Sequence, residues 1–251
     1  WTEFDGAAYD AAPSLRYIVR YGVGYDNLDV PAASERGIML CNVQGYANHS
    51  VSDHALALML ACIRNLRQGS DQLRSHYGAP PRPHMPDLKD MTLGIVGLGR
   101  IGGTLCGKAG GLFKRVLACD PYIPAKRFDA LHTEPRAFED LLAESDVVSI
   151  HCNLSDETRS MFDAAALANM RSTAILINTA RGPIVDEDAL LSALNAGQLY
   201  AAGLDVYWDE PPLENRDALL AHPHVQATGH YAWYSNDAAR ELQRRAAENM
   251  A

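Results

Sequence analysis

The sequence has few of the features that mark secreted, metal-clamped or membrane-spanning proteins. Its five cysteines, Cys41, Cys62, Cys106, Cys119 and Cys152, are scattered and form no CxxC pair. This pattern argues against a disulfide framework and a structural zinc site, and it indicates a reducing compartment such as the cytoplasm. The longest apolar run, ALALMLACI at 55–63, is far shorter than the roughly 20 residues of a membrane span. We therefore expect no membrane association.

Basic residues and metal-binding spacings are also scarce. Lys and Arg number 22 against 31 Asp and Glu, which gives a formal net charge of -9. Nucleic-acid binding needs a basic surface, so we expect no nucleic-acid partner. His49 and His54 are five residues apart, whereas two ligands on one helical face should be four apart. We expect no metal.

Short apolar runs alternate with amphipathic stretches through most of the chain. Hydrophobic residues make up 47% of the 251 residues, enough for one large or two smaller domains. The strand-like runs lie at 92–97, 115–119, 146–150, 173–178, 201–206 and 224–228. Their spacing approaches the roughly 30 residues of a βαβ unit, and a helix is expected between them at 186–198. The pattern predicts an α/β fold with a doubly wound parallel sheet, covered by helices on both faces.

The N-terminal part follows a different pattern. Two further strand-like runs lie at 15–20 and 37–42, with a helical DVPAASERG segment between them. Two parallel strands alone leave edges and faces exposed, so these runs indicate an incomplete second domain. A long apolar helix is expected at 50–68, followed by a proline-rich connector at 75–90. We predict a partial N-terminal domain at 1–47, the doubly wound domain at 48–231 and a C-terminal helix at 232–251 that returns toward the first domain.

A glycine-rich turn follows the strand expected at 92–97. The sequence Gly97-Leu98-Gly99-Arg100-Ile101-Gly102 is a GxGxxG motif that opens a helix. Gly97 permits the tight turn, Gly99 lets a pyrophosphate approach the backbone, and Gly102 allows close helix–strand packing. The N–H groups at the start of the helix, at Arg100 and Ile101, face the same anion. The motif predicts a dinucleotide site; a glycine-rich turn without a ligand is the structural alternative.

Asp120 stands at the end of the next strand, in the sequence RVLACDPY. A carboxylate there accepts hydrogen bonds from both ribose hydroxyls and repels a 2′-phosphate, so NAD is favoured over NADP. Lys126 and Arg127 follow closely. With Asp120 in place, we interpret them as solvated charges.

Three chemically complementary side chains follow later strands. Arg181 lies in INTARGPIVDE, Glu210 in LDVYWDEPP with Asp205, and His230 in ATGHYAWYS. Reduction of a 2-keto acid needs a cation for the carboxylate, a general acid, and a partner that keeps this acid protonated. Singly, Arg181 could be a surface charge, Glu210 a turn residue and His230 a structural histidine. Together at one sheet edge, they indicate an active site.

These motifs, in this order, identify a family likeness. RYGVGYDNLDV, GLGRIG, CDPY, NTARGPIVDEDAL, LDVYWDEPP and HYAWYS resemble the D-isomer-specific 2-hydroxyacid dehydrogenases. VSDHALALML and AWYS look most like the branch that includes the C-terminal binding proteins. The resemblance implies a Rossmann NAD-binding domain, an incomplete flavodoxin-like substrate domain, NAD as cofactor and a small 2-keto or D-2-hydroxy acid as substrate. It also implies a homodimer with helix 51–67 at the interface.

The resemblance implies a role for each matched residue. His230 would be the general acid/base, Glu210 the partner that favours its protonated form, and Arg181 the substrate-binding cation. The cofactor-binding residues would be Gly97, Gly99, Arg100, Ile101, Gly102, Asp120, Cys152, Thr179, Ala180, Asp205 and His230. Asp205 and Thr179 would lie near the nicotinamide carboxamide. The substrate-binding residues would be Arg20, Gly22, Val23, Gly24, Arg181 and Trp233, with Tyr46 as a further wall of the pocket.

The chain also departs from the family pattern. Gly229 stands where proline usually precedes the catalytic histidine, which predicts a less restricted backbone at His230. The front of the substrate domain is missing relative to family members, so an inactive fragment is one alternative to a dehydrogenase. An NAD(H)-sensing corepressor of the C-terminal binding protein type is the other.

Overall fold

The fold is described from a computed structural model, which covers residues 3–75, 77–80, 82, 84–211 and 216–250. The chain divides into two compact units. The smaller unit comprises residues 1–50 and 233–251, and the larger comprises Val51–Ala232. The domain boundaries predicted from sequence fall after residues 47 and 231. The boundaries of the structural units fall after residues 50 and 232.

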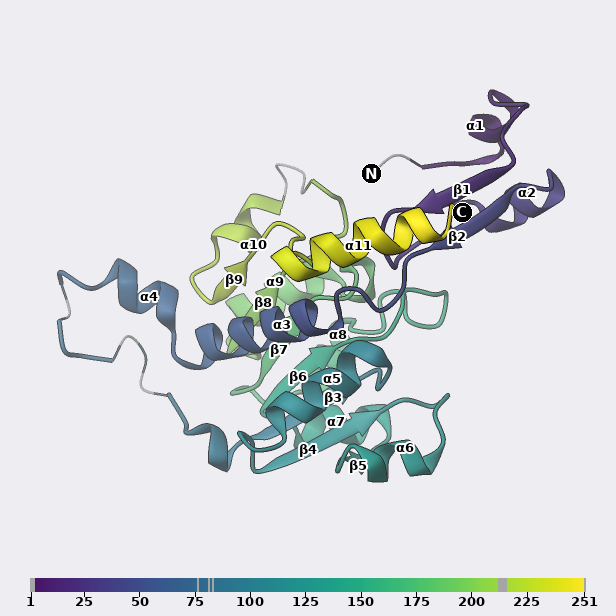
Figure 1. Cartoon of the computed structure of the whole chain (residues 1–251). Helices are drawn as coiled ribbons and strands as arrows, with labels where there is room; N and C mark the ends of the chain where they lie inside the picture. Colours follow the sequence, from purple (N-terminus) through teal and green to yellow (C-terminus); the bar gives the residue numbers. More distant parts are fainter. Residues whose placement is uncertain (1–2, 76, 81, 83, 212–215, 251) are drawn as a thin grey trace. The chain divides into compact units, whose positions relative to one another are not determined.

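The larger unit is built on a seven-stranded sheet in which every neighbouring pair is parallel. The strands are β3 (Thr92–Val96), β4 (Arg115–Cys119), β5 (Glu134–Pro135), β6 (Val147–Ile150), β7 (Ile175–Asn178), β8 (Ala201–Leu204) and β9 (Val225–Ala227). Their order is β5-β4-β3-β6-β7-β8-β9, so the direction of winding reverses between β3 and β6 (Figure 1). The predicted doubly wound sheet is confirmed. The edge strand β5 was not predicted, because it has two residues and one is proline.

Helices cover both faces of this sheet because alternate strand residues point to opposite sides. Val148, Ile150 and Leu176 pack in one buried cluster with residues of helices α7 (Phe138–Glu144), α8 (Ala164–Asn169), α9 (Glu187–Asn195) and α10 (Asp217–Ala221). Their chain neighbours Val147 and Ile175 belong to a second cluster, with residues of α3 (Asn48–Ile63), α5 (Arg100–Ala109) and α6 (Ala125–Ala130). The continuous apolar strands of the sequence thus fill two core layers.

Single polar residues set where several of the helices begin and end. Asp186 caps α9 by accepting from the N–H groups of Asp188 and Ala189, and Asp163 caps α8 in the same way. The helix expected as one element over 50–68 is instead two, α3 and α4 (Leu66–Asp71). Asn65 interrupts it with a left-handed backbone, φ 50°. Asparagine tolerates this conformation better than other non-glycine residues, a local signal that the apolar pattern masked.

The smaller unit holds a two-stranded parallel sheet. Strands β1 (Tyr17–Arg20) and β2 (Met39–Asn42) pair in register, joined through α2 (Val30–Glu35), and α1 (Gly6–Asp10) precedes them. The C-terminal helix α11 (Asn236–Glu248) belongs to the same unit, since Leu242 and Ala246 pack with Val43. The Arg245 guanidinium also donates to the Gln44 carbonyl at 2.7 Å.

Candidate active site

The predicted site residues of the larger unit gather at one edge of its sheet. Parallel strands present all their carboxyl ends on the same side, and open α/β sheets bind ligands where the winding reverses. Gly97 follows β3 and Cys152 follows β6, the two strands at that reversal. Asp120 directly follows β4. Arg181, Asp205 and His230 follow the adjacent strands β7, β8 and β9.

The glycine-rich turn is built for close backbone approach. Gly97 has φ 92°, and a Cβ there would lie 2.4 Å from the Cys152 nitrogen. A Cβ at Gly102 would lie 2.1 Å from the Gly97 carbonyl oxygen. Gly99, in contrast, faces open space within 4 Å and precedes the first residue of α5, Arg100. The first N–H groups of a helix lack intrahelical partners, so this turn fits a pyrophosphate.

The Asp120 carboxylate braces the same turn. Its Oδ2 accepts the Leu98 N–H at 2.9 Å and its Oδ1 accepts the Tyr122 N–H at 3.1 Å. Each carboxylate oxygen has a second lone pair, so these bonds leave room for ribose hydroxyls. The backbone of the phosphate turn and the candidate ribose acceptor are therefore positioned together.

The two cations that follow Asp120 lie closer to the phosphate turn than expected. Lys126 and Arg127 line a cavity of about 630 Å³ together with Gly99 and Arg100. Arg127 also donates a long hydrogen bond, 3.4 Å, to the Gly99 carbonyl. Both side chains remain exposed, as the solvated-charge interpretation requires, but Arg127 also contacts the phosphate turn.

The loop after β7 offers a buried polar atom without a protein partner. The Thr179 hydroxyl oxygen is buried and accepts or donates no hydrogen bond within the described chain. Such groups are rare unless a ligand or water satisfies them, so Thr179 fits a bound polar group. Asn178 holds this loop, since its Oδ1 accepts the Ala180 N–H at 3.0 Å and its amide donates to the Arg181 carbonyl at 2.8 Å.

Cys152 lies beside the glycine-rich turn, and its thiol is chemically inert. Burial raises the pKa of the Cys152 thiol to about 12, which leaves it protonated at neutral pH. Its backbone nitrogen approaches Gly97, as noted above. The residue therefore lines this region as a small apolar group.

The loops that carry Arg181 and Glu210 touch through their backbones. A Cβ at Gly182 would lie 1.8 Å from the Tyr207 carbonyl carbon and oxygen, so only glycine fits there. The Tyr207 N–H in turn donates to Glu210 Oε1 at 3.1 Å. The Tyr207 hydroxyl donates to the Thr228 carbonyl at 2.8 Å. Tyr207 thus links the loops after β7, β8 and β9.

His230 and Glu210 form a direct pair. The imidazole Nδ1 is hydrogen-bonded to Glu210 Oε2, and both side chains are largely buried. Since a carboxylate only accepts, Nδ1 carries a hydrogen, which leaves Nε2 as the ring nitrogen available for proton exchange. His230 has φ 54°, an unfavourable conformation for a residue with a Cβ. Its N–H donates to the Asp205 carbonyl at 2.7 Å, which holds the backbone there.

Asp205 is fully buried and its carboxylate is bonded within the protein. Its position near the nicotinamide carboxamide stays a prediction. Its Oδ1 accepts the Thr228 hydroxyl at 2.6 Å and the Tyr231 N–H at 3.2 Å. Its Oδ2 accepts the Ala232 N–H at 2.9 Å. The carboxylate therefore anchors the segment that carries His230.

The remaining predicted substrate residues belong to the smaller unit. Arg20 ends β1, and its guanidinium donates to the Tyr21 carbonyl at 2.7 Å. The Gly22–Val23–Gly24 loop is held by the end of β2, since Val43 N–H donates to Gly22 and the Asn42 amide to Val23. Trp233 meets Tyr46 edge to face, with ring centroids 6.3 Å apart.

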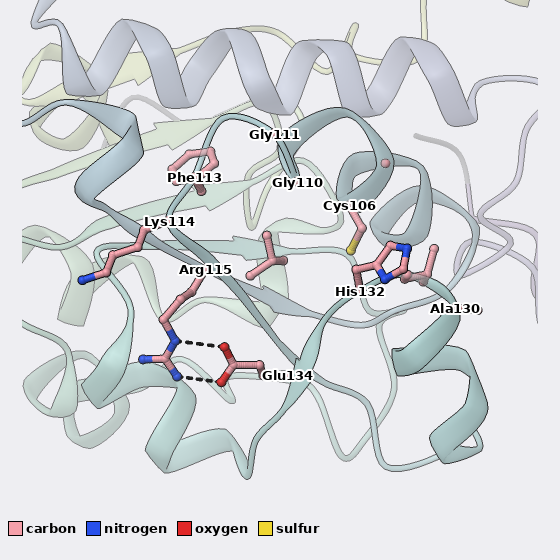
Figure 2. Close-up of a pocket in the computed structure, with 12 residues that line it drawn as sticks. Cys106, Gly110, Gly111, Phe113, Lys114, Arg115, Ala130, His132 and Glu134 are labelled. Carbon is pink, nitrogen blue, oxygen red and sulfur yellow. Dashed lines mark hydrogen bonds and ion pairs between the residues drawn. The ribbon is translucent and has the colours of Figure 1, made fainter.

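A separate pocket of about 440 Å³ lies at the opposite edge of the sheet, where β4 begins and α5 ends. Figure 2 shows the Arg115–Glu134 ion pair and His132 around it. None of the predicted site residues lines it. Across the described ranges, the structure groups no three metal-binding side chains in one place and contains no helix able to cross a bilayer.

Four residues of the site were not predicted as such. Asn178, Gly182, Tyr207 and Thr228 position the loops of the candidate catalytic residues through the contacts given above. Asn178 and Gly182 flank Arg181 in the quoted INTARGP motif, and a polar residue that ends an apolar strand was an available signal. Tyr207 and Thr228 left no comparable signal, because their partners lie on other strands.

Comparison with known proteins identifies the family of the chain. The family model described as "D-isomer specific 2-hydroxyacid dehydrogenase, NAD binding domain" matches residues 56–232. D-3-phosphoglycerate dehydrogenase of Mycobacterium leprae is 38% identical over 231 residues, which cover 90% of this chain and 44% of that protein. Glyoxylate reductase of Korarchaeum cryptofilum is 37% identical over 250 residues, covering 98% of this chain and 75% of the relative.

Solved structures give the same result. D-lactate dehydrogenase from Aquifex aeolicus, complexed with NAD and lactic acid, superimposes with a TM-score of 0.92 at 25% identity. The match covers 99% of this chain and 79% of that one. This chain spans less than half the length of the mycobacterial relative. The narrower likeness to the C-terminal binding proteins stays a prediction. On its matched residues and its cofactor turn, the chain belongs to the D-isomer specific 2-hydroxyacid dehydrogenase family and carries that family's NAD-binding domain.

Proposed function

We propose that this protein reduces a small 2-keto acid to the D-2-hydroxy acid with NADH, and catalyses the reverse oxidation with NAD. The observation that carries the proposal is the His230–Glu210 pair at the carboxyl edge of a sheet whose β3 turn fits a pyrophosphate. A hydrogen-bonded acid and carboxylate beside a dinucleotide cradle is the arrangement that carbonyl reduction needs.

Each residue has a defined task in this proposal. Bound NADH supplies the hydrogen and electron pair that reach the carbonyl carbon. Arg181 binds the substrate carboxylate and polarises the carbonyl, and His230 gives the proton on Nε2 to the carbonyl oxygen as it becomes a hydroxyl. Glu210 stabilises the positively charged imidazole through Nδ1. In the reverse direction, neutral His230 accepts that proton.

The substrate class follows from the relatives and from the predicted carboxylate sites. Glyoxylate reductase and hydroxypyruvate reductase are among the similar proteins, and both are named for short 2-keto acids. Arg20 and the N–H groups of Gly22, Val23 and Gly24 would add to carboxylate binding, with Trp233 as a wall. We therefore propose glyoxylate and hydroxypyruvate as the first substrates to test.

The direct test is NADH oxidation by the purified protein with a panel of 2-keto acids. Turnover with at least one short keto acid supports the proposal, and no turnover with any of them rejects it. His230→Gln should lower kcat by roughly 10²–10⁴-fold, the usual contribution of a general acid. NADH affinity, measured by fluorescence titration, should change little. Exposed His132, at the opposite sheet edge, offers a matched control in His132→Asn, which should leave kcat unchanged.

A variant of Glu210 tests the role of its charge. Glu210→Gln keeps the size and one acceptor but removes the charge that stabilises protonated His230. We expect a lower kcat for reduction, roughly 10-fold to 100-fold, with the oxidation direction less affected, because it needs the neutral imidazole. Initial rates in both directions measure this asymmetry. Equal loss in the two directions would contradict the charge role of Glu210.

We further propose a homodimer in a reducing compartment, the cytoplasm. All five cysteines are free in the structure, in keeping with such a compartment. Helix α3 would contribute to the dimer interface with its half-buried Leu56 and Leu60. Light scattering coupled to size exclusion measures the mass of the particle, and a monomer at micromolar concentration would contradict the proposal.

A further inference from the structure

A buried chain of polar groups connects helix α3 to the loop of His230. Its centre is the Asp205 carboxylate, whose side chain is 1% exposed. Asp205 holds the backbone at His230 and directly after it, since its carbonyl accepts the His230 N–H and its carboxylate accepts the N–H groups of Tyr231 and Ala232. Three consecutive backbone groups thus depend on one residue.

His54 of α3 reaches this centre through Thr228. Its Nε2 lies 2.9 Å from the Thr228 hydroxyl oxygen and 3.5 Å from Asp205 Oδ1. The imidazole also contacts the Tyr231 ring edge to face, with centroids 5.2 Å apart. His54 is 18% exposed at its side chain. All these residues belong to the larger unit.

Hydrogen-bond chemistry fixes the direction of the chain. A carboxylate that accepts two backbone N–H groups can only accept from the Thr228 hydroxyl as well, at 2.6 Å. The Thr228 hydroxyl has one hydrogen, so it must accept from its other close partner. His54 therefore donates from Nε2 to Thr228, and Thr228 donates to Asp205. Chains of this kind strengthen one another in a low-dielectric interior.

This series of hydrogen bonds matters because His230 has an unfavourable backbone conformation. Its φ of 54° persists only when its surroundings hold it. We propose that His54 is a positioning residue for His230, acting through the Thr228 hydroxyl and the Asp205 carboxylate to hold residues 230–232. This inference rests on the proposed role of His230 as proton donor. His54 itself is not a catalytic residue, because it bonds to Thr228 and not to the proton-transferring ring.

Two substitutions separate the hydrogen bond from the packing of the ring. His54→Gln keeps an N–H donor near the position of Nε2 but loses the aromatic contact with Tyr231. His54→Phe keeps the aromatic contact and loses the donor. If the donor matters, the Gln variant resembles wild type and the Phe variant is impaired; the opposite order overturns the inference. Ile63→Val is the control for packing, since Ile63 lies on the same helix and packs in the buried core away from these hydrogen bonds.

The first readout is amide hydrogen exchange of the peptide that contains residues 228–232. Exchange should be faster in His54→Phe than in wild type, and close to wild type in His54→Gln and Ile63→Val. This measurement needs neither substrate nor turnover. Unchanged exchange in His54→Phe overturns the positioning role, whatever the activity of the protein.

The second readout is kinetic. His54→Phe should lower kcat by roughly 10-fold to 100-fold, the range caused by a displaced catalytic group, with the KM for NADH nearly unchanged. The Gln variant should recover most of the loss. If wild type turns over no keto acid, the proposed function fails while the exchange result still judges the chain. If wild type is active and His54→Phe is equally active, only the positioning role fails.

Thr228 provides an independent check on the same chain. Thr228→Val removes the hydroxyl at nearly constant shape, and Thr228→Ser retains it. The effects of Thr228→Val and His54→Phe on kcat should be strongly non-additive, because both break one chain. Additive effects in the double variant would show that the two residues act separately and would overturn the relay.

Discussion

The Asp120 carboxylate illustrates how one residue can serve the protein and a ligand at once. It holds the Leu98 and Tyr122 N–H groups, and the remaining lone pairs are those proposed for the ribose hydroxyls. Its negative charge is also the reason to expect discrimination against a 2′-phosphate. A substitution at this position therefore affects both the turn and the choice of cofactor.

Asp120→Asn should narrow the preference for NADH over NADPH. The amide keeps one acceptor oxygen but removes the repulsion toward a 2′-phosphate, and Lys126 and Arg127 lie on the adjacent cavity wall. We expect the ratio of the NADPH and NADH dissociation constants to fall by about tenfold, or about 1.4 kcal/mol. Fluorescence titration with both cofactors measures it. Asp129→Asn, an exposed carboxylate on α6, serves as control, and an unchanged ratio in Asp120→Asn would refute the charge argument.

At the scale of elements, the loops after β7 and β8 meet so closely that no side chain fits between their backbones. Gly182→Ala would place a Cβ against backbone atoms of Tyr207, which cannot rotate away as a side chain can. We expect a loss of about 1–3 kcal/mol in the free energy of unfolding, as for other overpacked sites, together with a lower kcat. Urea denaturation and initial rates measure the two effects. Wild-type behaviour in both would mean that the loops separate readily.

Gly229 presents the opposite case. A Cβ there meets nothing within 4 Å, and its φ lies outside the left-handed range. Gly229→Ala should therefore stabilise the fold by about 0.4–1 kcal/mol, because it restricts the unfolded chain. The melting temperature should rise by a few degrees. A decrease would indicate that the loop of His230 requires the freedom of glycine.

The predictability of these elements from sequence varied with the range of their contacts. The apolar runs located six of the seven strands of the large sheet, because buried parallel strands are apolar on both faces. Asn65 divided the expected long helix through its own backbone conformation, and β5 escaped because it is too short for a pattern. Local motifs also located the His230–Glu210 pair. The partners of the Asp205 side chain were not predictable, because they come from α3 and from the segment after β9, far apart in the sequence.

At the scale of the whole molecule, two partly buried histidines make stability depend on pH. Burial lowers the pKa of His151 to about 4, and burial together with nearby Arg82 lowers that of His224 to about 4. The unfolded chain binds protons on these residues below about pH 6.5, while the folded chain does not. Stability should therefore fall as the pH drops from about 6.5 toward 4, by at most about 1.4 kcal/mol per pH unit for each histidine.

His151→Asn should remove part of this dependence. The backbone bond from His151 to Val96 is retained, and only the ring and its contact with Ser149 are lost. Urea denaturation of wild type and variant at pH 7 and pH 5 measures the difference, and His222 and His224, whose pKa values are also lowered, contribute to what remains. Parallel pH curves for the two proteins would exclude His151 as a source.

The larger unit is one uninterrupted stretch of the chain, Val51–Ala232, and its last residue is also the last one tied to Asp205. One continuous segment of the sequence thus encodes the cofactor turn, the proposed proton donor and the hydrogen bonds proposed to position it. Recombination with a relative at only two junctions, Ser50/Val51 and Ala232/Trp233, would exchange this entire segment. Chimeras built in this way would inherit the cofactor turn, the proposed proton donor and the hydrogen bonds around it from a single parent.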